Sequence, residues 1–94
     1  MGKAEYKVVG GKLIKVQLTR RDDKIQRIKI MGDFFLHPEE LIEDLEASLT
    51  GQQLNESTLA NGIKAFMEKK GAALLGASPE DFAKCIAMAG MADD

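Results

Sequence analysis

Residues 13–20 read Leu13-Ile14-Lys15-Val16-Gln17-Leu18-Thr19-Arg20, with apolar and polar side chains in alternation. Successive side chains of an extended chain point to opposite faces, so Ile14, Val16 and Leu18 share one face. This alternation is typical of a β-strand with one face buried and the other in water. We therefore expect a strand here, with Lys15 on its solvent-exposed face.

Two more strands are expected beside this one, over residues 6–9 and 24–31, which are rich in β-branched side chains. Gly10-Gly11 breaks the chain before the central strand, and a polar run at residues 21–24 follows it. Short breaks of this kind favour hairpin connections. The sequence therefore predicts an antiparallel meander of three strands.

The register of the second and third strands decides which charges face each other. Val16 and Ile28 turn to the same side if they lie opposite each other, and Lys15 then lies opposite Lys29. Like charges that are directly opposed across a sheet repel. In this register the outer face of the sheet would favour an anion or an acidic partner.

Three helices are expected after the strands. Pro38 suits a first helical position, and the apolar stripe that follows it ends at Gly51. Asn55 or Ser57 can cap the second helix, which ends at Gly71, and Ser78-Pro79-Glu80-Asp81 opens the third. The element order is βββααα, which predicts one α+β domain of two layers over residues 1–94.

Composition limits the classes of function. The chain has 94 residues and a net charge of −2, but residues 1–31 are basic and residues 32–94 are acidic. No apolar run is long enough to span a membrane, and the start of the chain has no secretory signal, so we expect a cytoplasmic protein. The net negative charge and the lack of aromatic residues among the lysines argue against nucleic acid as a partner.

The junction between the third strand and the first helix reads Gly32-Asp33-Phe34-Phe35-Leu36-His37-Pro38. Phe34 and Phe35 point opposite ways in extended backbone, so one is expected in the core and the other at a rim or on a partner. Asp33 and His37 could form an acid–base pair, but no further residue completes a catalytic set. We expect a structural corner with a surface for a partner.

Two other features could carry chemistry. Gly10-Gly11-Lys12 is followed by a strand rather than a helix, so it is not a phosphate loop, although Lys12 beside bare backbone could contact an anion. Cys85 has no second cysteine to pair with, and its place next to an apolar stripe favours a small buried side chain over a reactive thiol.

Several segments together resemble the C-terminal accessory domain of lipoate-protein ligase, which in some archaea is a separate small subunit. The resemblance covers nearly the whole chain and rests on Glu5-Tyr6-Lys7-Val8, Gly10-Gly11-Lys12-Leu13, Gly32-Asp33-Phe34-Phe35, Pro38-Glu39-Glu40-Leu41-Ile42 and Ser78-Pro79-Glu80-Asp81-Phe82. It implies a fold similar to that of iron-sulfur scaffold and sulfur-acceptor proteins, with a small antiparallel sheet packed against helices.

The resemblance also implies a role. In this family a large catalytic subunit uses ATP, Mg and lipoate to form lipoyl-AMP, then passes the lipoyl group to a lysine of an acceptor domain. The small module supports adenylation, has no activity alone and holds no cofactor of its own. The positions expected near the partner or substrate are Lys7, Gly10, Gly11, Lys12, Lys15, Asp33, Phe34, Phe35 and His37.

Two alternatives remain open from the sequence. A sulfur acceptor of similar fold would need Cys85 to be exposed and reactive. A general binding module would use the basic meander to hold an acidic protein. No residue is assigned to catalysis or to a metal.

Overall fold

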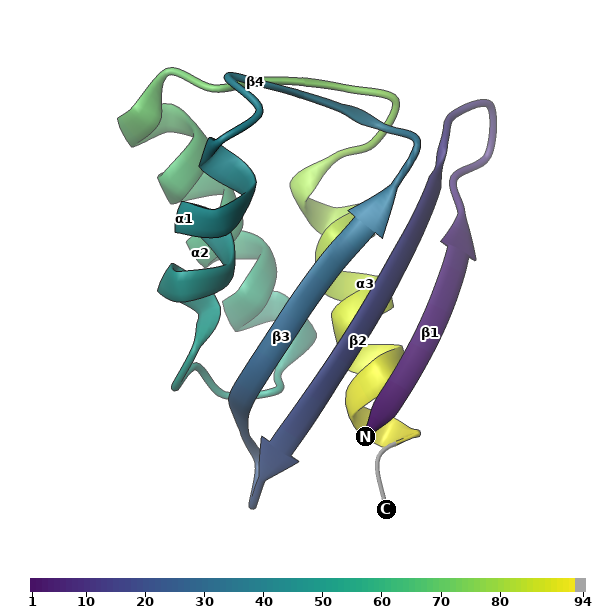
Figure 1. Cartoon of the computed structure of the whole chain (residues 1–94), viewed down its shortest axis with the longest axis vertical. Helices are drawn as coiled ribbons and strands as arrows, with labels where there is room; N and C mark the ends of the chain where they lie inside the picture. Colours follow the sequence, from purple (N-terminus) through teal and green to yellow (C-terminus); the bar gives the residue numbers. More distant parts are fainter. Residues whose placement is uncertain (93–94) are drawn as a thin grey trace.

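A computed structural model describes residues 1–92 of the chain (Figure 1). Three antiparallel strands form the main sheet in the order β1-β2-β3. They are β1 (Gly2–Lys7), β2 (Leu13–Arg21) and β3 (Lys24–Gly32). The predicted meander is confirmed, although β1 begins at Gly2 rather than at residue 6.

The register of β2 and β3 differs from the expected one by two residues. Val16 lies opposite Ile30, and Lys15 lies opposite Met31. The expected pairing of Lys15 with Lys29 is therefore wrong. Because the shift is an even number of residues, each side chain keeps the face that the alternation predicts.

The cause of the shift lies at the turn between β2 and β3. Arg21 pairs with Lys24 around a two-residue turn in which Asp22 has a φ of 58°. A bulge opposite Thr19 and Arg20 then leaves one extra residue, Gln26, in β3. The turn and the bulge together move the rest of the pairing, and neither feature is visible as a hydrophobic pattern.

The corrected register changes the charge of the outer face. Lys15 lies opposite Glu5 of β1, and Gln17 rather than Lys15 lies opposite Lys29. Opposite charges that face each other across strands attract. The repulsion that would have made this face an anion site is therefore absent at Lys15.

Three helices follow the sheet, as predicted, and they are α1 (Leu41–Leu49), α2 (Glu56–Lys70) and α3 (Pro79–Met91). Asn55 rather than Ser57 caps α2, since its side chain accepts a hydrogen bond from the Thr58 N–H, and Gly71 ends the helix in the left-handed conformation. Ser78 begins α3 with a reciprocal capping box to Asp81.

Pro38 is not the first residue of α1. The peptide bond between His37 and Pro38 is cis, and the Pro38 carbonyl accepts a hydrogen bond from Leu41 N–H in a turn that precedes the helix. Glu40 is the N-cap residue, so α1 begins three positions later than the sequence predicts. The turn is needed because His37 belongs to a strand.

That strand is part of a second, two-stranded sheet that the sequence does not predict. Its strands are β4 (Phe35–His37) and β5 (Ala73–Leu75), which run antiparallel. β5 lies between α2 and α3, so the order of elements is not simply βββααα. Strands of three residues are too short for the alternation of side chains to identify them.

The core lies between the sheet and the helices. α3 crosses behind β1 and β2, while α1 and α2 lie beyond β3 (Figure 1). The inward side chains of the sheet, Ile14, Val16, Leu18, Ile28 and Ile30, are buried together with Phe82 and Ile86 of α3. Glu46 of α1 accepts a hydrogen bond from Ile30 N–H at 2.7 Å and so covers the edge of β3.

Among residues 1–92, no helix is both long enough and apolar enough to cross a membrane.

Candidate functional site

Three segments that are distant in sequence meet at one end of the molecule. They are the turn between β1 and β2 (residues 8–12), the start of the corner after β3 (residues 32–34), and Gly76 after β5, and we call them the hairpin end. Lys12 N–H donates to the Gly76 carbonyl at 2.8 Å, and Asp33 N–H donates to the Leu13 carbonyl at 3.2 Å. Figure 1 shows the β1–β2 turn at the same end as the two-stranded sheet of β4 and β5, which we call the β4–β5 ribbon.

The glycines of the hairpin end allow this close approach. A Cβ atom on Gly11 would collide with the Gly76 carbonyl, and one on Gly32 would collide with the Leu13 carbonyl. Gly10 has a φ of 71°, a left-handed conformation that glycine adopts without strain. The Gly10-Gly11 pair therefore serves as a tight turn, as the sequence predicts, and also as a docking point for the segment around Gly76.

Lys7 and Lys12 are brought together at this end. The Lys7 ammonium donates a hydrogen bond to the Gly11 carbonyl, and the Lys12 side chain lies over Gly76. Both side chains are exposed. Two cations beside the tight turn give the hairpin end a positive character.

Asp33 has a structural role. Its Oδ1 atom accepts a hydrogen bond from Leu13 N–H at 2.6 Å, while its own N–H donates to the Leu13 carbonyl. This reciprocal pair fastens the start of β2 to the chain that leaves β3. The carboxylate is thus already engaged, which is consistent with the absence of a complete catalytic set in the sequence.

Lys15 lies on the outer face of β2, opposite Glu5 and two residues along from Leu13, which pairs with Lys7. It lines a shallow hollow of about 320 Å³ together with Leu13, Met31, Gly32 and Asp33. Lys15 therefore shares a hollow with Asp33 and a sheet face with Lys7.

Phe34 and Phe35 divide as predicted. Phe34 packs edge-to-face on Phe82, with ring centroids 4.8 Å apart, whereas Phe35 is 64% exposed. Phe35 also borders a groove of about 240 Å³ whose walls include Ile30, Met31 and Ile42. An exposed aromatic ring beside a groove is suited to a partner surface.

His37 is exposed on β4, opposite Ala73 of β5. It belongs to the ribbon, while Asp33 is bound to β2, so these two residues serve different elements. His37 contributes a polar side chain beside Phe35, at the border of the hairpin end.

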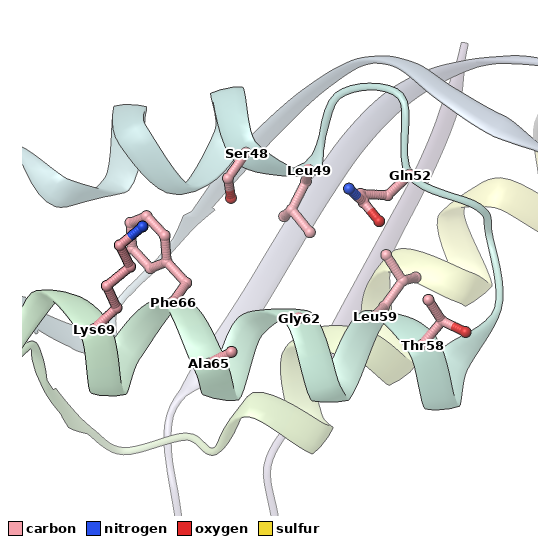
Figure 2. A pocket seen from close by; sticks show the side chains of 9 residues that line it. All are labelled: Ser48, Leu49, Gln52, Thr58, Leu59, Gly62, Ala65, Phe66 and Lys69. Atoms are coloured by element: carbon pink, nitrogen blue, oxygen red, sulfur yellow. The ribbon is translucent and has the colours of Figure 1, made fainter.

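A third cavity, of about 200 Å³, lies between α1 and α2 (Figure 2). Leu49, Leu59 and Phe66 line it, with Gln52 and Thr58 near one end and Lys69 near the other. The sequence does not predict this groove, because it depends on the spacing between two helices. Gly62 helps to form it, since no atom lies within 4 Å of where its Cβ would be.

Cys85 is fully buried on α3, and its Sγ lies 3.7 Å from the carbonyl oxygens of both Ala4 and Ile14. Burial, and secondarily the charge of Glu5, raises the pKa of this thiol to about 11. The thiol is therefore neutral near pH 7 and shielded from solvent, which argues against the sulfur-acceptor alternative.

Across residues 1–92, no three or more His, Cys, Asp and Glu side chains are grouped so that they could hold a metal ion.

The fold and the hairpin end define a small α+β domain that exposes cations and an aromatic ring for contact with another molecule. A family model described as bacterial lipoate protein ligase C-terminus matches residues 4–86. The chain belongs to this family.

Two relatives from Thermoplasma acidophilum add detail. Over 74 residues the chain is 35% identical to lipoate-protein ligase A subunit 2, covering 79% of this chain and 76% of that protein. It also matches a chain in the structure of an archaeal lipoylation system, described as a bi-partite lipoate protein ligase and its E2 lipoyl domain. That match has 32% identity and a TM-score of 0.77, covering 89% of this chain and 91% of the other.

Proposed function

We propose that this chain is the small, non-catalytic subunit of a two-subunit lipoate-protein ligase and that it supports the adenylation of lipoate. The observation that carries the proposal is the family match over residues 4–86, together with a relative named as subunit 2 of such a ligase. The structure of a bi-partite ligase with a chain of similar fold adds support.

The chemistry assigned to the complex is acyl activation. The lipoate carboxylate attacks the α-phosphorus of ATP, which releases pyrophosphate and forms the mixed anhydride lipoyl-AMP. The amine of an acceptor lysine then attacks the lipoyl carbonyl carbon, and AMP leaves. ATP, Mg and lipoate are used by the complex, and the large subunit holds them.

The small subunit contributes to the reaction by binding the large subunit, and it supplies no catalytic residue. It docks on the large subunit and orders the segment that covers the nucleotide and lipoate, so that water does not hydrolyse the anhydride before transfer. Lys7 and Lys12 are the residues assigned to reach the partner or a phosphate group, because both residues are exposed at the hairpin end.

The test is lipoate-dependent pyrophosphate release by the mixed subunits, with each subunit alone as a control. We expect pyrophosphate release by the mixed subunits to be at least tenfold faster than by either subunit alone, or to occur only in the mixture. Equal activity of the large subunit without this chain would contradict the accessory role.

The double substitution Lys7→Ala with Lys12→Ala tests the assigned residues. We expect it to slow pyrophosphate release by about tenfold or more, corresponding to about 1.4 kcal/mol of lost transition-state stabilisation. The matched control is Lys3→Ala with Lys64→Ala, which removes the same charge from two other exposed positions. If both pairs have the same rate, Lys7 and Lys12 have no part in the reaction.

A further inference from the structure

Several large apolar side chains remain exposed among residues 1–92, and they gather at opposite ends of the molecule. Val9 is 94% exposed, Phe35 64% and Leu75 66%, and all three belong to the hairpin end or the adjoining ribbon. Met1, Met88 and Met91 are exposed at the other end, where the chain start lies beside the end of α3 (Figure 1).

Phe35 and Leu75 form a fixed pair. They lie directly opposite each other in the β4–β5 ribbon, so they share one face of it. The neighbouring Leu36 and Leu74 point to the other face, where Leu36 is buried and Leu74 is partly buried against the core. The pairing of β4 with β5 therefore places an aromatic and an aliphatic side chain together on the solvent-exposed face of the ribbon.

Val9 lies in the β1–β2 turn, which is hydrogen-bonded to the residue that follows Leu75. Leu75 precedes Gly76, and Val9 precedes the Gly10-Gly11 pair that packs on Gly76. The hydrogen bond from Lys12 N–H to the Gly76 carbonyl holds the two segments together. We call the three side chains Val9, Phe35 and Leu75 the apical patch.

Two lysines border the apical patch on the Val9 side. Lys7 and Lys12 lie at the turn beside Val9, and the polar side chain of His37 lies on the same strand as Phe35. On the Phe35 side, the exposed Glu39 lines the neighbouring groove, and the Asp33 carboxylate is bound to Leu13 N–H. A complementary surface would therefore have an apolar centre and carboxylates opposite Lys7 and Lys12.

The groove beside Phe35 makes the patch a surface with both a projection and a recess. Its walls are Ile30, Met31, Gly32, Phe34, Phe35, Leu36, Glu39 and Ile42. A partner that receives the Phe35 ring could place an apolar side chain of its own in this groove. Binding energy tends to concentrate at paired, desolvated anchors of this kind.

Given the proposed function, on which this inference rests, we propose that the apical patch is the docking surface for the catalytic subunit, which presents an apolar recess bordered by Asp or Glu side chains. A second copy of this chain is a poorer occupant, because a two-fold contact would set Lys7 and Lys12 against the same basic surface. The two lysines beside Val9 thus favour carboxylates on the part of the partner that faces them.

The test is the affinity of this chain for the large subunit, measured by isothermal titration calorimetry. Phe35→Ser and Leu75→Ser should each weaken binding at least tenfold, and the double variant more than a hundredfold. Met91→Ser, which removes an equally exposed apolar side chain at the opposite end, should stay within twofold of the wild type. If the double variant also binds within twofold, the docking surface is wrong.

Val9 supplies a second test that does not depend on the ribbon. It is almost fully exposed in a turn, so Val9→Glu and Val9→Lys should both fold. Against an acidic border, Val9→Glu should bind at least tenfold more weakly than Val9→Lys. Equal affinities, or the reverse order, would overturn the proposed charge of the partner.

The two proposals fail in different ways. If the wild-type chain does not bind the large subunit at all, the proposed function fails and the docking surface fails with it. If the wild type binds and stimulates pyrophosphate release while the Phe35, Leu75 and Val9 variants do the same, only the docking surface is wrong.

Discussion

The hairpin end and the opposite end of the molecule both expose apolar side chains, but they hold them differently. Next to the hairpin end, Phe35 and Leu75 are paired across the β4–β5 ribbon, and Gly76 joins that ribbon to the β1–β2 turn. At the opposite end, Met1 and Met91 are at least as exposed, and they are unbranched side chains with several rotatable bonds. Exposure of the same order therefore accompanies unequal rigidity.

This difference matters for binding. A side chain that is already held in one place loses little conformational entropy when a partner covers it, whereas a mobile methionine loses more. Aromatic side chains also provide large contact area with few rotatable bonds. Binding at the hairpin end and the adjoining ribbon should therefore cost less conformational entropy than binding at the opposite end.

The largest expected effect is on the backbone contacts that hold the hairpin end together. Gly32 has a φ of 149°, and a Cβ there would collide with the Leu13 carbonyl. Gly32→Val should lower the free energy of unfolding by about 2–4 kcal/mol, through backbone strain and overpacking. Urea denaturation of the isolated chain measures this loss.

Gly62→Ala is the matched control for that substitution. Gly62 lies within α2 and has open space where its Cβ would be, so alanine should raise stability by about 0.5–1 kcal/mol. A Gly32 variant as stable as the wild type would show that the hairpin end is not rigid, and the comparison between the two ends would lose its basis.

An intermediate effect on stability is expected from substitution of Asp33, whose carboxylate joins the start of β2 to the segment after β3. Asp33→Ala leaves Leu13 N–H without its acceptor and should cost about 1–2 kcal/mol of stability. Asp33→Asn keeps an acceptor oxygen and should cost less. Hydrogen exchange at the Leu13 amide is the direct measurement, and unchanged protection in Asp33→Ala would contradict the assigned role.

The sequence predicts most of the larger elements for identifiable reasons. Alternation over residues 13–20 identifies β2 and its buried face, because Ile14 and Val16 repeat with the period of a strand. Ser78 and Asp81 identify the start of α3, since a capping box is local in sequence. Such signals need only neighbouring residues.

What the sequence does not predict depends on contacts between distant segments. β5 is recognisable only beside β4, and the contact of Gly11 with Gly76 joins residues that no local pattern connects. The bulge at Thr19 moves the register of β2 and β3 without changing which side chains are apolar. For the same reason the sequence points to one of Phe34 and Phe35 as a partner residue but not to Leu75.

The smallest expected effect concerns the stability of the isolated chain when exposed apolar side chains are removed. Full burial of a large apolar side chain contributes about 1.5–3 kcal/mol, and Phe35 is only about one-third buried. Phe35→Ser should therefore cost about 0.5–1 kcal/mol in urea denaturation, and Met91→Ser less than about 0.5 kcal/mol.

These small values would sharpen the contrast between the two ends. If Phe35→Ser and Met91→Ser leave the isolated chain nearly as stable as the wild type, a loss of affinity in Phe35→Ser alone reflects binding and not folding. If instead Phe35→Ser costs more than about 2 kcal/mol, its ring holds the β4–β5 ribbon together. Weak binding by that variant would then follow from a disrupted surface. In that event the Val9 variants, and not Phe35→Ser, would test whether the hairpin end is an interface.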